Sequence, residues 1–284
     1  MKTTFSILGA SLILSCASVC QANVIFSQDF SSSSIVSDYV NATPNSGQWN
    51  AISTSGAGTT VSIAGGSMQY THNGVNAGSF TRNTDFSPTP PAMIYNFDLT
   101  VSGISTLSAV PTAATWGVGS GYGTQNSDPS PSSLNNSRFA IGFNTDGTYN
   151  FHVVGGATSS SFSSGTTVGV TWVINDAGGS LSYLGPDGNV DIVGNGMWDL
   201  WAGSTLIFNE KPADNTSSSL SELKFVFENT AATGIIAMDN FSIQAVPEPA
   251  GWGAISALGL MGICGLREWR QRRCGEKLKS CPVK

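Results

Sequence analysis

Cysteine is missing from almost the whole length of this 284-residue sequence. All five cysteines lie in the two terminal segments, and none occurs between Gln21 and Ile263 (Cys16, Cys20, Cys264, Cys274, Cys281). This absence excludes disulfides, cysteine-ligated zinc and cysteine nucleophiles from the central part of the chain. A domain there must therefore rely on an ordinary hydrophobic core, for which its length suffices.

Charged residues are also scarce, at 11 % of the sequence, and they are unevenly distributed. Residues 21–246 contain 15 acidic and 4 basic residues, whereas residues 267–284 contain 7 basic and 2 acidic ones. Because an acidic domain repels phosphate backbones, nucleic acid is not expected as a partner. The low charge and the 33 glycines favour short strands and turns over long helices, and the length fits one domain.

The first 22 residues have the pattern of a secretory signal peptide. Lys2 precedes an apolar run, and small residues follow it as far as Ala22. Cleavage after Ala22 would leave residues 23–245 as the exported domain, with Ala17 as an alternative cleavage site. The two cysteines of this segment raise the alternative of a lipoprotein, but the residues around them match a lipoprotein signal poorly.

A second apolar segment lies near the C-terminus. Residues 250–266 carry no charge, and as a helix they would reach about 25 Å, the short end of what spans a bilayer. We expect one transmembrane helix here, with the tail 274–284 in the cytoplasm and the domain outside. A buried core helix is the alternative, which the basic residues that follow do not favour (Arg267, Arg270, Arg272, Arg273).

This end of the chain resembles the PEP-CTERM sorting signal of Gram-negative bacteria. The residues that carry the resemblance are an apolar span, a basic cluster at 267–273 and the motif before the span (Val246, Pro247, Glu248, Pro249). The resemblance implies that a membrane-embedded exosortase or archaeosortase recognises and cuts the tail. The protein would then pass from a membrane-anchored form to the cell surface or an extracellular polysaccharide matrix.

Between the terminal segments, short apolar runs alternate with turn-forming residues, which is typical of antiparallel β structure. The sequence therefore predicts an all-β fold, an antiparallel β-sandwich of jelly-roll type. Nine strands are predicted, at residues 24–30, 59–63, 93–101, 138–144, 149–154, 168–175, 181–184, 220–227 and 235–243.

The connections between these strands are predicted from their turn residues. Short turns within residues 138–192 indicate a meander, whereas residues 31–47 and 102–134 are expected to be long loops. In the strand 220–227, the apolar residues alternate with Glu222 and Lys224. This alternation predicts one buried face and one solvent-exposed face.

The domain also resembles concanavalin-like and laminin-G-like jelly rolls, through residues 26–30, residues 172–175 with the turn 186–188, and residues 238–243. The resemblance implies that the first and last strands pair. It also implies a structural calcium ion between them, for which the candidate ligands are Asp29, Asp239 and Asn240. The same residues are equally suited to turns or to a solvated edge, and no other cofactor is expected.

Aromatic side chains are the usual platforms for sugar rings. Trp198 and Trp201 flank Asp199 and are the candidate carbohydrate contacts. Because residues three apart on a strand point to opposite faces, at most one of them can line a given sheet surface, and core packing is the favoured alternative.

No catalytic pattern is recognisable among the carboxylates or the two histidines. The sequence therefore predicts an exported, non-catalytic surface or matrix protein whose sandwich binds carbohydrate or exopolysaccharide. An exported hydrolase that acts on polysaccharide and a purely structural or adhesive matrix component are the alternatives.

Overall fold

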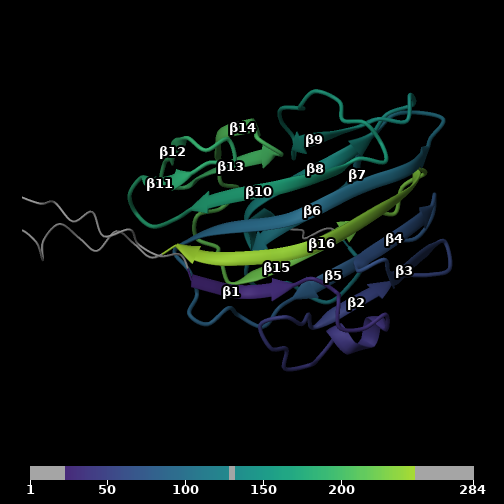
Figure 1. Ribbon diagram of the computed structural model, residues 1–284, viewed down its shortest axis with the longest axis horizontal. Coiled ribbons are helices and arrows are strands. Elements are labelled where there is room, and N and C mark those ends of the chain that lie inside the picture. The colour runs from purple at the N-terminus through teal and green to yellow at the C-terminus, as the bar shows by residue number, and fades with distance from the viewer. Residues whose placement is uncertain (1–22, 128–131, 247–284) are drawn as a thin grey trace, which may run out of the picture.

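The computed structural model describes residues 23–127 and 132–246, which form two antiparallel sheets packed face to face (Figure 1). The predicted all-β antiparallel sandwich is confirmed. The predicted signal peptide and residues 247–284, with the rest of the sorting motif and the predicted membrane helix, lie outside the described residues. Within the described ranges, no helix is long and apolar enough to cross a membrane.

The larger sheet has eight strands, in the order β14-β13-β10-β6-β16-β4-β3, with β1 paired to part of β16. Its strands are β1 (Asn23–Gln28), β3 (Thr59–Ala64), β4 (Ser67–Asn73), β6 (Ala92–Ser105), β10 (Thr167–Asn175), β13 (Met197–Ala202), β14 (Thr205–Pro212) and β16 (Thr233–Val246).

The smaller sheet has six strands, in the order β2-β5-β15-β7-β8-β9. Its strands are β2 (Ala51–Thr54), β5 (Gly78–Arg82), β7 (Val110–Gly119), β8 (Asn135–Phe143), β9 (Tyr149–Val153) and β15 (Glu222–Phe227). The remaining elements are a two-stranded hairpin, β11 (Leu181–Leu184) with β12 (Val190–Val193), and the 3₁₀ helices η1 (Val36–Tyr39) and η2 (Ser132–Leu134). The chain crosses repeatedly between the two sheets, as it does in a jelly roll.

β16 is the strand that organises the larger sheet. One of its edges pairs with β6 along nearly its whole length, while the other pairs first with β4 and then with β1. The change of partner falls at a β-bulge after Asp239, where Asn240 has a φ of 51°, a conformation that asparagine tolerates. The predicted pairing of the first and last strands is confirmed, and it places Asn23 beside Ala245.

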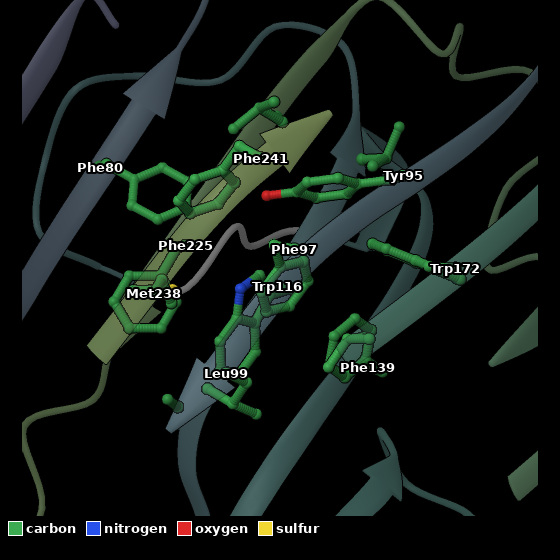
Figure 2. Packing of buried hydrophobic residues seen from close by; sticks show 14 of the residues in the cluster. Phe80, Tyr95, Phe97, Leu99, Trp116, Phe139, Trp172, Phe225, Met238 and Phe241 are labelled. Atoms are coloured by element: carbon green, nitrogen blue, oxygen red, sulfur yellow. The ribbon is translucent and has the colours of Figure 1, made fainter. Parts of the chain in front are cut away.

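The core lies between the sheets and is dominated by aromatic rings (Figure 2). Alternate residues of β6 point inward, as the period of a strand requires. From this strand, Phe97 stacks on Trp116 of the opposite sheet, with ring centroids 5.8 Å apart, and Trp116 stacks on Phe139 at 5.1 Å. The predicted inward residues of β15 (Leu223, Phe225, Phe227) also lie in this core.

The predicted loop at 102–134 was wrong in part, because it contains β7, a central strand of the smaller sheet. Pro111, two alanines and two glycines interrupt the alternation of large apolar residues by which a strand is recognised. β7 is a strand because β15 and β8 pair with its two edges, and a partner as distant in sequence as β15 leaves no local signal.

The predicted meander at 138–192 was also wrong. The turn at 144–147 does close the hairpin β8–β9, and the turn at 185–188 closes the hairpin β11–β12. Between them, however, the chain crosses to the larger sheet, where β10 pairs with β6 and β13. Turn residues set the local chain reversal and carry no information about the sheet that the next strand joins.

Phe241 provides a test of this packing. Its ring lies within 5.5 to 6.2 Å of five other rings, from both sheets and the segment between β1 and β2 (Phe30, Trp49, Phe80, Tyr95, Phe97). We expect Phe241→Ala to lower the free energy of unfolding by about 3–5 kcal/mol, measured by denaturant titration. Leu107→Ala, at a fully exposed side chain, is the control and should change it by less than about 0.5 kcal/mol. Equal effects of the two substitutions would contradict the packing.

Candidate functional site

A hollow opens on the outer face of the smaller sheet, with a volume of about 530 Å³, which is in the range of sites for small ligands. Its lining comes from the residue before β5, the first half of β7, the loop that follows β7, the residue after β9 and the segment between β15 and β16. Thr230 of that segment lies three residues before β16 begins at Thr233, whereas Val246 is at the other end of this strand, next to the pair Asn23 and Ala245. The hollow is therefore at the end of β16 opposite to Asn23 and Val246.

The polar groups of the hollow are mostly uncharged. Thr112 and Thr115 provide hydroxyls, Asn126 and Asn229 provide amides, and Glu228 provides a carboxylate. These groups donate and accept hydrogen bonds in the way that sugar hydroxyls require. The hollow can therefore hold a polar, uncharged ligand with many hydroxyls.

Asn126 is held in place by the neighbouring strands. The hydroxyls of Ser53 in β2 and Ser79 in β5 donate to Asn126 Oδ1 at 3.0 and 2.6 Å. These two bonds bring the loop after β7 across the sheet to the edge of the hollow. Asn126 lies in the predicted loop 102–134, but nothing in its local sequence marks it as a site residue.

The prediction that Glu222 and Lys224 lie on a solvent-exposed face was wrong, because the loop after β7 covers that face of β15. Both are buried, with exposed fractions of 7 % and 3 %. The backbone N–H of Tyr122 donates to Glu222 Oε2 at 2.6 Å, and Lys224 Nζ donates to the carbonyl of Gly123 at 3.0 Å. The outer face of β15 is thus covered by a loop that these two charged side chains hold.

The segment 228–230 is fixed by one hydrogen bond at each end. The N–H of Glu228 donates to the carbonyl of Ala113 in β7 at 2.8 Å, and the carbonyl of Thr230 accepts from His72 Nε2 at 3.1 Å. Burial lowers the pKa of His72, so its imidazole is neutral at pH 7. His72 therefore positions one wall of the hollow and is part of the packing.

Trp198 and Trp201 lie on opposite faces of β13, as their spacing predicted. Trp198 faces the core, 6.0 Å from Trp172, and Trp201 lies in a second, smaller cluster beneath the β11–β12 hairpin. Their exposed fractions are 1 % and 3 %. Since neither indole offers a face to solvent, both belong to the core-packing alternative and neither can stack on a sugar in this structure.

A buried polar network lies beside Trp201, and no sequence pattern predicted it. Trp201 Nε1 donates to the hydroxyl of Tyr183 at 2.9 Å, and that hydroxyl donates to Asp199 Oδ2 at 2.7 Å. The other oxygen of Asp199 accepts from the N–H of Glu210, which has a φ of 47° at an irregularity of β14. Burial raises the pKa of Asp199. The hydrogen bonds of Asp199 show that it joins the β11–β12 hairpin to the irregular part of β14.

The predicted calcium ligands lie near one another where β1 ends beside the bulge of β16. Asp29 accepts hydrogen bonds from the N–H and hydroxyl of Ser31, and Asn240 Nδ2 donates to Asp98 Oδ2 at 2.8 Å. Partial burial and the charges of Asp98 and Asp29 raise the pKa of Asp239. Among the residues that the structure describes, no three Asp, Glu, His or Cys side chains are grouped to hold a metal ion. The hydrogen bonds of Asp29 and Asn240 are those of a turn and a bulge, and the calcium site stays a prediction.

Comparison with known proteins finds no matching family model and no matching curated protein. The chain is similar to a solved structure described as the conserved carbohydrate esterase vb_24B_21 from the Shiga toxin-encoding bacteriophage phi24B, with 12 % identity and a TM-score of 0.49, covering 80 % of this chain and all of that one. It is also similar to the carbohydrate recognition domain of Emp46p, with 13 % identity and a TM-score of 0.44, covering 66 % of this chain and 86 % of that one.

A third similar structure is a sialidase, with 12 % identity and a TM-score of 0.43. The likeness covers 68 % of this chain but only 16 % of the sialidase. All three TM-scores are below 0.5, so the class of the fold, an antiparallel β-sandwich, rests on the strand order of this chain itself.

The loop beside the hollow should respond to pH through Glu222. Burial raises the pKa of Glu222 to about 6, above its ordinary value of 4.5, and the charge of Asp85 adds to this effect. Because the folded state binds the proton more tightly than the unfolded state, the ionised carboxylate destabilises the fold at pH 7, and this penalty disappears as the pH falls through 6 toward 4.5. Glu222→Gln should therefore raise the free energy of unfolding at pH 7, by up to about 2 kcal/mol.

The measurement is denaturant titration of both proteins from pH 4.5 to pH 7.5. The difference between them should be fully present above about pH 6 and absent near pH 4.5. The glutamine oxygen can still accept from the N–H of Tyr122, so the hydrogen bond is kept. A difference that does not change with pH would contradict the burial of this carboxylate.

Proposed function

We propose that the protein is an exported, non-catalytic carbohydrate-binding protein whose sandwich binds a polysaccharide of the cell surface or extracellular matrix. The observation that carries the proposal is the hollow at the far end of the sandwich, with its lining of hydroxyl, amide and carboxylate groups. A neutral polysaccharide fits this lining, because it presents many hydroxyls and carries no charge that an acidic domain would repel.

The lining favours binding over hydrolysis. Glycoside hydrolysis ordinarily requires two carboxyl groups on either side of the bond that is cut. Of the described residues that line the hollow, Glu228 alone carries a carboxylate. One carboxylate can accept hydrogen bonds from sugar hydroxyls, but it cannot serve as both the acid and the nucleophile or base.

The proposal includes export and sorting. The proposal rests here on the signal-peptide pattern of residues 1–22 and on the Pro-Glu-Pro motif at 247–249, with the apolar segment and the basic cluster that follow it. In it, an exosortase or archaeosortase cuts the tail of a membrane-anchored form, and the protein passes to the surface or matrix.

Binding can be tested with glycan arrays. We expect the array signal of the wild-type protein to be reduced by at least about tenfold in Thr112→Val, which removes a hydroxyl, and in Glu228→Gln, which removes the negative charge that strengthens hydrogen bonds from sugar hydroxyls; each loss is worth about 1.5 kcal/mol. Thr100→Val is the matched control, since Thr100 lies on the outer face of the other sheet, where its hydroxyl bonds that of Thr167. Its signal should equal that of the wild type.

The alternatives predict different results in the same experiment. Release of shortened glycans by the wild-type protein would support an exported hydrolase. An array with no signal for any glycan would support a purely structural or adhesive role. A signal that survives both substitutions would place carbohydrate binding elsewhere on the domain.

Sorting can be tested by mass spectrometry of the protein recovered from the cell surface. We expect its C-terminal peptide to lack residues 267–284, because the proposed cut removes the tail that holds the basic cluster. A surface form that retains Arg267 to Lys284 would show that the tail stays in place and that the protein is membrane-anchored without processing.

A further inference from the structure

The β11–β12 hairpin covers one end of the outer face of the larger sheet. Its inward side chains, Leu181, Tyr183 and Val193, are buried in a cluster with Trp201 and Val246. This hairpin is therefore apolar on the side that contacts the sheet, as expected of a cover.

The outward side of the same hairpin is also apolar, and it is exposed. The exposed fractions are 70 % for Leu184, 73 % for Val190 and 53 % for Ile192. Leu184 and Val190 are directly paired across the two strands, and Ile192 lies two residues further along the same face of β12. The three side chains thus form one continuous patch, and a continuous exposed patch indicates an interaction surface.

The patch lies at the end of the sandwich where the chain continues toward the apolar segment 250–266. Val246, the last residue of β16, packs beneath the hairpin, and residue 250 follows four positions later. Four residues reach at most about 14 Å. Val24, with an exposed fraction of 52 %, pairs with Gln244 and so lies at this end as well.

We propose that the outward face of the β11–β12 hairpin binds the surface of the lipid bilayer in which segment 250–266 is anchored. The inference rests on the membrane anchoring in the proposed function. A bilayer that holds residue 250 lies within reach of the hairpin, and Leu184, Val190 and Ile192 enter its interfacial region. Before processing, the sandwich is then held at the membrane by two contacts, the anchor and the hairpin.

The charges near the patch indicate which lipid surface it binds. Asp187 lies in the exposed hairpin turn beside the patch, whereas Asp191 is paired with Tyr183 on the inward face. The exposed carboxylate of Asp187 disfavours a strongly anionic surface, so the contact is apolar and the lipid headgroups are zwitterionic. The hollow at the other end of the sandwich points away from this surface.

The experiment uses the full chain in phosphatidylcholine vesicles, with and without bromine on the acyl chains, which quenches tryptophan fluorescence at short range. One variant carries Val190→Trp in the patch. The matched control carries Val75→Trp, at another exposed valine, in the turn between β4 and β5 near the hollow. We expect brominated lipid to quench the emission that Val190→Trp adds to the wild-type signal and to leave the emission added by Val75→Trp unchanged.

A second substitution tests whether the apolar face itself makes the contact. Adding Ile192→Asp to Val190→Trp places a charge in the patch at an exposed position, and it should restore the quenched emission. Equal quenching of the two tryptophan variants, or none in either, would overturn the proposal. Such a result is expected if segment 250–266 or a membrane protein, and not the lipid, covers the patch.

Vesicle flotation separates this failure from failure of the anchor. A chain that floats with the vesicles while Val190→Trp is not quenched keeps its anchor and refutes the hairpin contact. A wild-type chain that does not float at all refutes both the anchor and the hairpin contact.

Discussion

Phe97 of the larger sheet stacks on Trp116 of the smaller sheet, and Trp116 stacks on its cross-strand neighbour Phe139, with interplanar angles of 19° and 6°. Phe241 also stacks on Phe97 at 5.6 Å, and Trp172 of the larger sheet meets Phe139 edge to face at 4.9 Å. With no cysteine between Gln21 and Ile263, the two sheets depend on this buried aromatic layer for their association. Each such ring buries a large apolar area, and each pair adds about 0.5–1.5 kcal/mol beyond that burial.

The core buries the inner faces of both sheets, and a different segment of the chain covers part of each outer face. The hairpin β11–β12 covers one end of the larger sheet, and the loop after β7 covers part of the smaller sheet. The second cover includes the buried charges of Glu222 and Lys224, which would cost free energy without partners. Their bonds to the loop backbone offset that cost, and they place Asn126 where it can line the hollow.

The sequence predicted the strands whose large apolar residues alternate, such as β6, β10 and β16, and it placed Trp198 and Trp201 on opposite faces. It missed β7, in which alanine and glycine take the positions of large residues. The strands β13 and β14 were also missed, since a two-residue turn, Gly203-Ser204, joins them with no clear break in the pattern. β13 and β14 pair with each other across this turn, whereas β7 depends on β15, a partner that is distant in sequence.

The hollow could not be predicted for the same reason. Its lining residues come from five separate parts of the chain, from Ala77 to Thr230, and only the strand order of the smaller sheet brings them together. The individual residues are threonines, asparagines and a glutamate, which are common at strand ends and turns whatever their role. The wrong prediction that Glu222 is exposed has the same cause, because the loop that covers it is about 100 residues away in sequence.

β16 relates the two ends of the sandwich to each other. Its 14 residues, at about 3.3 Å each, reach about 46 Å from the neighbourhood of the hollow to Val246 beneath the hairpin. It is paired along both edges, so the separation between these ends is fixed by two ladders of backbone hydrogen bonds. In the proposed topology, a bilayer that holds segment 250–266 lies at one end of this strand. The hollow at the other end is then open to polysaccharide both before and after the tail is cut, because cutting outside the sandwich changes none of the contacts that form it.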